Sequence, residues 1–152
     1  MRTTLDGADI RDLWGTDSSF LIAATQSEGV FRFDGVAWQQ WEPIQAVMVS
    51  GTSTSDIWLA DWSGWLHHYD GLGWSKTLVA AGFWTRAVAA IRPDDVYVAS
   101  SDGRIAHFDG AAWNIESSPA APPLLAITAS PSGNVIWAVG EAGAILRLDR
   151  RR

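Results

Sequence analysis

No cysteine occurs in the 152-residue chain, so disulfides, thiol catalysis and cysteine-ligated metal sites are excluded. Lysine occurs once, and even with ten arginines the formal net charge is −6. A protein that binds phosphate backbones needs clustered Lys and Arg, so we do not expect nucleic acid as a partner. No apolar run approaches the roughly 20 residues of a membrane helix, and no apolar signal-peptide segment follows Met1–Gly7. We therefore expect no membrane partner, and the sequence leaves the compartment open.

Groups suited to catalysis are also few. The three histidines are His67, His68 and His107, and the adjacent pair would point to opposite faces of a strand. The sequence has no Ser-His-Asp order, phosphate-binding glycine loop or metal-ligand motif. We therefore expect no enzyme activity, no metal and no cofactor. A glycoside-cleaving enzyme, which needs two carboxylates, is a minor alternative because Asp61 and Asp94–Asp95 are available.

Tryptophan is abundant, with ten residues, and most of the sequence follows an internal repeat. An aromatic-Asp-Gly-x-x-Trp motif occurs at 33–38, 69–74 and 108–113, and a shortened copy ends at Leu148-Asp149. Its Asp residues are 36, 39 and 40 residues apart. Three further positions recur in frame: Val30, Leu66, Ile105 and Ile145; Arg32, His68, His107 and Arg147; Leu13, Val47, Val88 and Ile127. Four aligned copies therefore cover nearly the whole chain.

Each copy contains four short segments that are rich in β-forming residues and separated by turn residues. In the second copy we expect strands near 46–49, 57–61, 65–70 and 74–79. Asp-Gly between the last two predicts a tight hairpin, because glycine accepts the positive φ that such turns need. No segment shows a helical period, so the sequence predicts an all-β protein.

A period near 40 residues with four strands is typical of β-propeller blades. The segment from Ile57-Trp58 through Gly64, Leu66 and His68 to Tyr69-Asp70-Gly71-x-x-Trp74, with its counterparts, resembles the repeat of bacterial kelch-like and two-component-regulator-like propellers. It is similar, more loosely, to tectonin-type lectin repeats. The resemblance implies one domain over 1–152 with four four-stranded antiparallel blades, at about 9–44, 45–83, 84–122 and 123–149 completed by 1–6. It says little about function, because such propellers host many activities.

The fourth copy stops at Asp149, before any fourth strand. The N-terminal segment Arg2–Leu5 is short and β-prone, and it resembles Ser75–Leu78, the fourth strand of the second copy. We expect this N-terminal strand to complete the last blade, since an open sheet edge exposes unpaired backbone groups. Two arrangements stay open: a closed four-bladed monomer, and two chains that form an eight-bladed homodimer ring.

Aromatic residues that recur in frame in three of the four copies have a structural explanation. Trp38, Trp74 and Trp113 recur, as do Trp58, Tyr97 and Trp137, and we expect both series to pack blade against blade. The repeated Asp residues are expected to cap turns. The Arg and His series is expected to belong to the same repeated polar network.

Four tryptophans, Trp41, Trp62, Trp65 and Trp84, have no counterpart in the other copies. In an up-and-down blade the turns between strands two and three lie on the same face as the blade-to-blade connections, so all four are expected on one face. Such an aromatic platform suits stacking against sugar rings, and we hypothesise a lectin-like, carbohydrate-binding propeller. The alternative is a protein-interaction or assembly module with no small-molecule ligand, including a self-assembling half-propeller.

Overall fold

The described residues of the computed structural model, 5, 7–117 and 122–150, form fifteen strands in four antiparallel sheets. The first sheet contains β1 (Ile10–Asp17), β2 (Phe20–Thr25), β3 (Val30–Phe33) and β4 (Trp38–Glu42). The second contains β5 (Met48–Ser53), β6 (Asp56–Ala60), β7 (Trp65–Tyr69) and β8 (Trp74–Leu78). The third contains β9 (Thr85–Arg92), β10 (Asp95–Ser100), β11 (Arg104–Phe108) and β12 (Trp113–Ser117). The fourth contains β13 (Leu124–Ala129), β14 (Val135–Gly140) and β15 (Ile145–Asp149).

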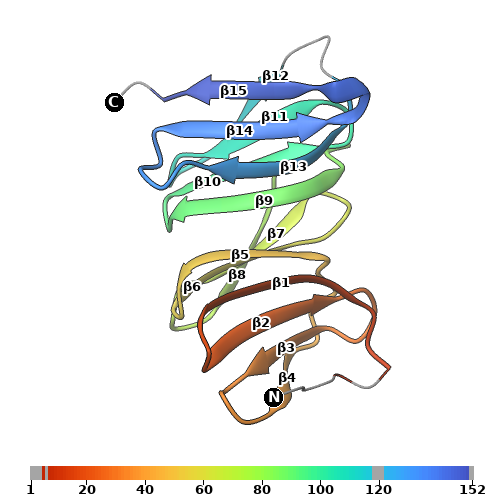
Figure 1. The fold of residues 1–152 in the computed structure, drawn as a ribbon, viewed down its shortest axis with the longest axis vertical. Helices are drawn as coiled ribbons and strands as arrows, with labels where there is room; N and C mark the ends of the chain where they lie inside the picture. The colour runs from red at the N-terminus through yellow and green to blue at the C-terminus, as the bar shows by residue number, and fades with distance from the viewer. Residues whose placement is uncertain (1–4, 6, 118–121, 151–152) are drawn as a thin grey trace.

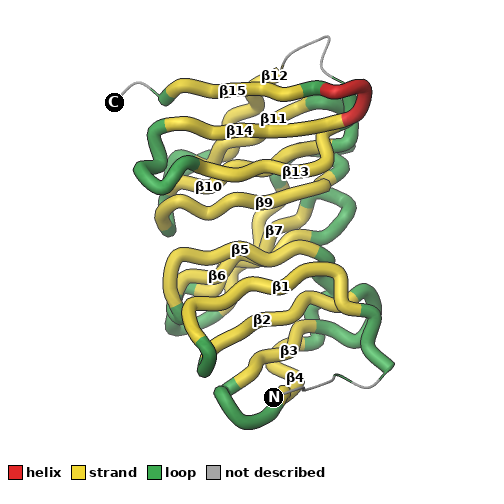
Figure 2. The backbone as a smooth tube through the Cα atoms, in the orientation of Figure 1, coloured by secondary structure: helices red, strands yellow, loops and turns green. Residues whose placement is uncertain are grey.

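The all-β prediction is confirmed, and within the described ranges the one helical element is a three-residue 3-10 turn, η1 (Glu141–Gly143) (Figure 2). No helix in this part of the chain is long and apolar enough to cross a membrane.

Tight hairpins join the last two strands of the first three sheets, as the Asp-Gly motif predicts. In the second sheet, Oδ1 of Asp70 accepts hydrogen bonds from the backbone N–H groups of Leu72 and Gly73, each at 2.9 Å. Gly71 has a φ of +90°, which only glycine adopts without strain. The same arrangement recurs at Asp34 and Asp109. The predicted capping role of these Asp residues is therefore confirmed.

The four sheets fan out from a row of inner strands (Figure 1). β1, β5, β9 and β13 are consecutive neighbours in this row, and each sheet extends away from it. The first sheet lies at the lower end of the view and the fourth at the upper end. The described strands therefore form an arc, and they do not close a ring within one chain.

The core consists of three clusters, one between each pair of neighbouring sheets. The first joins Ile22, Ala24 and Val30 to Val49, Ile57 and Leu59. The second joins Met48, Trp58 and Leu66 to Val96, Val98 and Ala106. The third joins Tyr97, Ala99 and Ile105 to Ile127, Ile136 and Ala138. Each sheet thus has one apolar face toward the sheet before it and one toward the sheet after it.

The inner strand of the second sheet begins two residues later than predicted, at Met48. Pairing shows why: Val49 lies opposite Leu59, just as Leu13 lies opposite Ala23 and Val88 opposite Val98. Val49, rather than the expected Val47, is therefore the counterpart of Leu13. The connection before this strand is itself apolar, so the sequence pattern did not show where the connection ends and the strand begins.

The fourth sheet has three strands in the described part of the chain, and β15 pairs only with β14. The N-terminal strand that was predicted to complete it falls mainly on residues 1–4, which lie outside the described residues. Leu5 is described and is not part of a strand.

Candidate functional site

The turn between β6 and β7 presents two of the four unrepeated tryptophans. Oδ1 of Asp61 accepts hydrogen bonds from the backbone N–H groups of Ser63, at 2.8 Å, and Trp65, at 3.0 Å. Gly64 has a φ of +87°. The carboxylate therefore holds the turn in a fixed shape, with Trp62 and Trp65 on either side of it.

The connection from β8 to β9 runs directly beside this turn. The N–H of Val79 donates to the carbonyl of Gly64 at 3.0 Å, and the N–H of Thr85 donates to the carbonyl of Trp62 at 3.1 Å. Phe83, fully buried, anchors the connection, and a Cβ at Gly64 would lie 2.6 Å from the Phe83 carbonyl oxygen. These bonds place Trp84 next to Trp62. We call Trp62, Trp65 and Trp84 the tryptophan edge.

All three side chains of the tryptophan edge are accessible to solvent. Trp62 is 42% exposed, Trp65 36% and Trp84 56%, whereas the repeated Trp58 is 1% exposed. Large aromatic side chains are costly to leave in water. The chain therefore maintains an aromatic surface at this edge that its core does not require.

Cations lie against the tryptophan edge, although the chain as a whole is acidic. Nζ of Lys76, the only lysine, is 4.5 Å from the ring centroid of Trp65, and the Arg86 guanidinium is 5.3 Å from that of Trp62. Such contacts fix the orientation of exposed rings. Burial lowers the pKa of the nearby His67, and the charge of Lys76 lowers it further. Sequence analysis did not single out Lys76 or Arg86, although the uniqueness of the lysine was a visible signal.

Trp41 does not belong to this exposed set, and its predicted place among the ligand-binding residues needs correction. Its ring packs edge-on against Tyr69 at 5.0 Å and against Trp74 at 5.2 Å. It is half-buried in the cluster between the first and second sheets. Trp41 ends up there because the outer strand β4 faces the outer hairpin of the next sheet.

Trp62 of the tryptophan edge borders a groove that runs along the inner strands. The groove, of about 540 Å³, is lined by Trp62 and Arg86 together with residues of the inner strands β1, β5, β9 and β13. Arg11 and Asp12 of β1 also line it. A ligand at Trp62 therefore has both an aromatic surface and a charged groove beside it.

Two of the three histidines, His68 and His107, make the same contacts in successive sheets. His68 contacts Oδ1 of Asp56 at 2.7 Å and stacks on Trp58, and His107 contacts Oδ1 of Asp95 at 2.9 Å and stacks on Tyr97. These histidines bind a second Asp series, at the first residue of the second strand, whereas Arg147 at the same repeat position donates to Asp149 of the expected Asp series at 2.6 Å. Recurrence in two sheets favours a role in packing.

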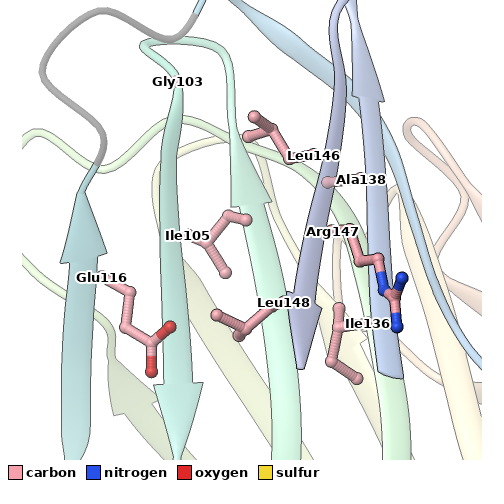
Figure 3. Close-up of a pocket in the computed structure, with 8 residues that line it drawn as sticks. All are labelled: Gly103, Ile105, Glu116, Ile136, Ala138, Leu146, Arg147 and Leu148. Carbon is pink, nitrogen blue, oxygen red and sulfur yellow. The ribbon is translucent and has the colours of Figure 1, made fainter. Parts of the chain in front are cut away.

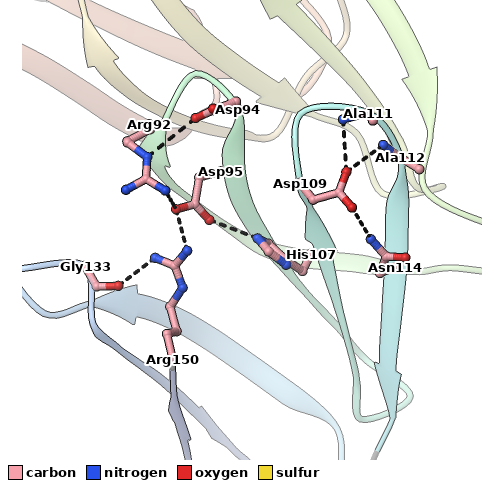
Figure 4. A network of polar contacts seen from close by, with 10 residues as sticks. All are labelled: Arg92, Asp94, Asp95, His107, Asp109, Ala111, Ala112, Asn114, Gly133 and Arg150. Atoms are coloured by element: carbon pink, nitrogen blue, oxygen red, sulfur yellow. Dashed lines mark hydrogen bonds and ion pairs between the residues drawn. The ribbon is translucent and has the colours of Figure 1, made fainter. Parts of the chain in front are cut away.

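Asp95 is the most connected of these carboxylates (Figure 4). In addition to its contact with His107, Asp95 accepts bonds from Arg92 at 2.8 Å and from Arg150 at 2.6 Å. Arg150 also donates to the Gly133 carbonyl at 2.6 Å, so this network joins the third sheet to the end of the fourth. Across the described residues, no cluster of three or more His, Asp or Glu side chains is arranged to hold a metal ion.

A second pocket, of about 280 Å³, lies between the third and fourth sheets (Figure 3). Its lining is mainly apolar and includes Ile105, Leu146 and Leu148. In the first three sheets the residue equivalent to Leu148 contacts the repeated tryptophan of the outer strand, as Phe108 contacts Trp113 at 5.2 Å. Within the described residues the fourth sheet lacks that strand, and the pocket lies beside Leu148, where the aromatic residue of such a strand would pack.

Comparisons with known proteins give a fold and no family. No family model matches the sequence, and no curated protein matches it. The chain is similar in structure to the computationally designed Ika4 protein, with a TM-score of 0.70 and 13% identity. The match covers 97% of this chain and 96% of that one. At this level of identity the likeness shows a shared arrangement of repeated β-sheets and nothing about activity.

Proposed function

We propose that the four sheets are blades of a β-propeller and that the chain is a non-catalytic binding module whose tryptophan edge takes carbohydrate. The arc of sheets around a row of inner strands supports the propeller arrangement, together with the repeated aromatic-Asp-Gly-x-x-Trp hairpin. The carbohydrate proposal is carried by one observation, the exposure of three unrepeated tryptophans that the backbone holds together at one edge.

The chemistry of the edge suits a sugar. The apolar face of a pyranose ring stacks on an indole, and Trp62 and Trp84 are two exposed indoles on adjoining backbone segments. Lys76 and Arg86 supply hydrogen-bond donors beside these rings for hydroxyl or carboxylate oxygens. The adjoining groove gives room for a chain of more than one sugar unit.

The test is a glycan array of neutral and acidic oligosaccharides, followed by calorimetric titration of the strongest hit. Trp62→Ala and Trp84→Ala should each weaken binding by about tenfold or more, since truncation of an aromatic anchor costs about 2 kcal/mol. Leu72→Ala is the matched control, because Leu72 is 96% exposed in the β7–β8 hairpin, at the opposite end of β7 from the turn that carries Trp62 and Trp65. Unchanged affinity in both tryptophan variants, or no binding to any glycan, contradicts the proposal.

The second candidate is an assembly module, which a separate observation favours. Apolar side chains are exposed on the outward faces of the first and fourth sheets, at positions that are buried in the other sheets. These faces are distinct from the tryptophan edge, so assembly and carbohydrate binding are compatible.

A further inference from the structure

We infer that two copies of this chain close an eight-bladed ring, in which the outward face of each fourth sheet packs on the outward face of the partner's first sheet. This inference rests on the propeller arrangement proposed above and is independent of the carbohydrate ligand. It deepens the assembly hypothesis by naming the faces and the residues that meet.

The outward face of the fourth sheet is built to receive another sheet. Four residues before each turn Asp, Val30 and Leu66 are fully buried and Ile105 is 8% exposed, whereas Ile145 is 68% exposed. The first three contact the following sheet, and Ile145 has no following sheet to contact. This position is buried in three of the four copies. This face of a sheet therefore fits the opposite face of a sheet that is built from the same repeat.

An aromatic position on the same face is likewise buried in the second and third sheets and exposed in the fourth. Trp58 and Tyr97 are buried against the next sheet and stack on His68 and His107. The equivalent Trp137 is 39% exposed, with Arg147 over its ring at 5.6 Å. The fourth sheet therefore retains the packing residues of an inter-blade face without a blade to cover them.

The outward face of the first sheet also exposes positions that are buried in the other sheets. Val49 and Ile127 are buried against the preceding sheet, whereas Leu13, their counterpart on β1, is 54% exposed. Ile10 is also about half exposed, although its counterparts Ala46, Thr85 and Leu124 are fully buried. The two open faces are thus the two halves of an interface that the chain already makes three times.

A second copy is the occupant that fits both faces at once. The faces lie at opposite ends of the arc, so one partner related by a two-fold axis covers both and closes the ring (Figure 1). Each copy then contributes four of eight blades and leaves no outward face open. An unrelated partner would have to match two different faces at opposite ends of the molecule.

The internal interfaces specify which inner-strand residues should meet. Oδ2 of Asp12 accepts a bond from the N–H of Val49 at 2.9 Å, and the equivalent pairs Met48 with Val88 and Ala87 with Ile127 lie in the same core clusters. By the same register, Ala126 of one copy lies against Leu13 of the partner.

Cross-linking tests this register directly, because the chain has no cysteine of its own. A chain with Leu13→Cys and Ala126→Cys should form a covalent dimer under mild oxidation. The control, Leu72→Cys with Ala126→Cys, places one thiol at an exposed hairpin outside the interface and should remain largely uncross-linked. Equal cross-linking in the two proteins overturns the inference, as does a double variant that stays monomeric.

Light scattering supplies a test that needs no bond to form. Ile145→Glu should halve the mass in solution at unchanged circular dichroism, because a carboxylate would be buried in the interface. Leu72→Glu makes the same change at a 96% exposed site and should leave the dimer intact. A dimer that resists Ile145→Glu overturns the inference.

Discussion

At the scale of the residue, tryptophan divides into two classes with different physical roles. Recurrence in frame predicts burial for Trp58, and the structure confirms it, because its ring packs between the second and third sheets. Absence of a counterpart predicts exposure for Trp62, Trp65 and Trp84, which are exposed. The same argument fails for Trp41, since the space between two outer strands varies from copy to copy. Alignment of the copies shows which residues the repeat requires. It cannot show where an unrepeated side chain, such as the Trp41 ring, fills space between two sheets.

The two classes should differ in their effect on stability. Trp58→Ala removes a fully buried ring that contacts Phe108 and Trp113, and it should reduce the free energy of unfolding by about 3–5 kcal/mol. Trp62→Ala should change it by no more than about 0.5 kcal/mol, since the side chain is 42% exposed and belongs to none of the three core clusters. Urea denaturation at one protein concentration measures both. Comparable losses in the two variants would show that Trp62 is a core residue.

At the scale of the element, hairpins were predictable because their chemistry is local. Asp-Gly fixes the turn through bonds between a carboxylate and the two N–H groups that follow, so the strands on either side could be placed from sequence. The start of β5 could not, because it depends on pairing with β6 across a connection of similar composition. The cations at the tryptophan edge were also missed, since cross-strand contacts such as that of Lys76 with Trp65 need the register to be known.

Turn capping makes stability depend on pH in a definite direction. Backbone N–H groups of Ala112 and Ala111 hold the pKa of Asp109 below its ordinary value of 3.8. A carboxylate with a lowered folded pKa stabilises the fold fully above the unfolded pKa, and this contribution is lost as pH falls through the folded value. Asp109→Asn removes the titration and keeps an oxygen that can accept the same bonds.

The variant should therefore show a smaller fall in Tm than the unmodified chain between about pH 5 and pH 2. Thermal melts followed by circular dichroism measure the difference between the two proteins at each pH. Parallel curves would mean that the Asp109 carboxylate contributes nothing to the pH dependence.

At the scale of the whole molecule, the number of repeats was evident from the sequence and the angle between them was not. The angle depends on how side chains fill the three inter-sheet clusters, and the same motif is compatible with rings of different size. The structure resolves this for the single chain, whose sheets form an arc with two open ends (Figure 1). Exposed Leu13 at one end and exposed Ile145 at the other are the positions that the proposed second copy would cover.

The mass of the unmodified chain in solution tests the half-ring account most directly. Size-exclusion chromatography with light scattering should give about twice the 16.5 kDa chain mass over a wide range of protein concentration. A closed dimer leaves no free interface, so larger species should not appear as the concentration rises. A mass of 16.5 kDa at every concentration, or growth into a continuing series of oligomers, would contradict the account.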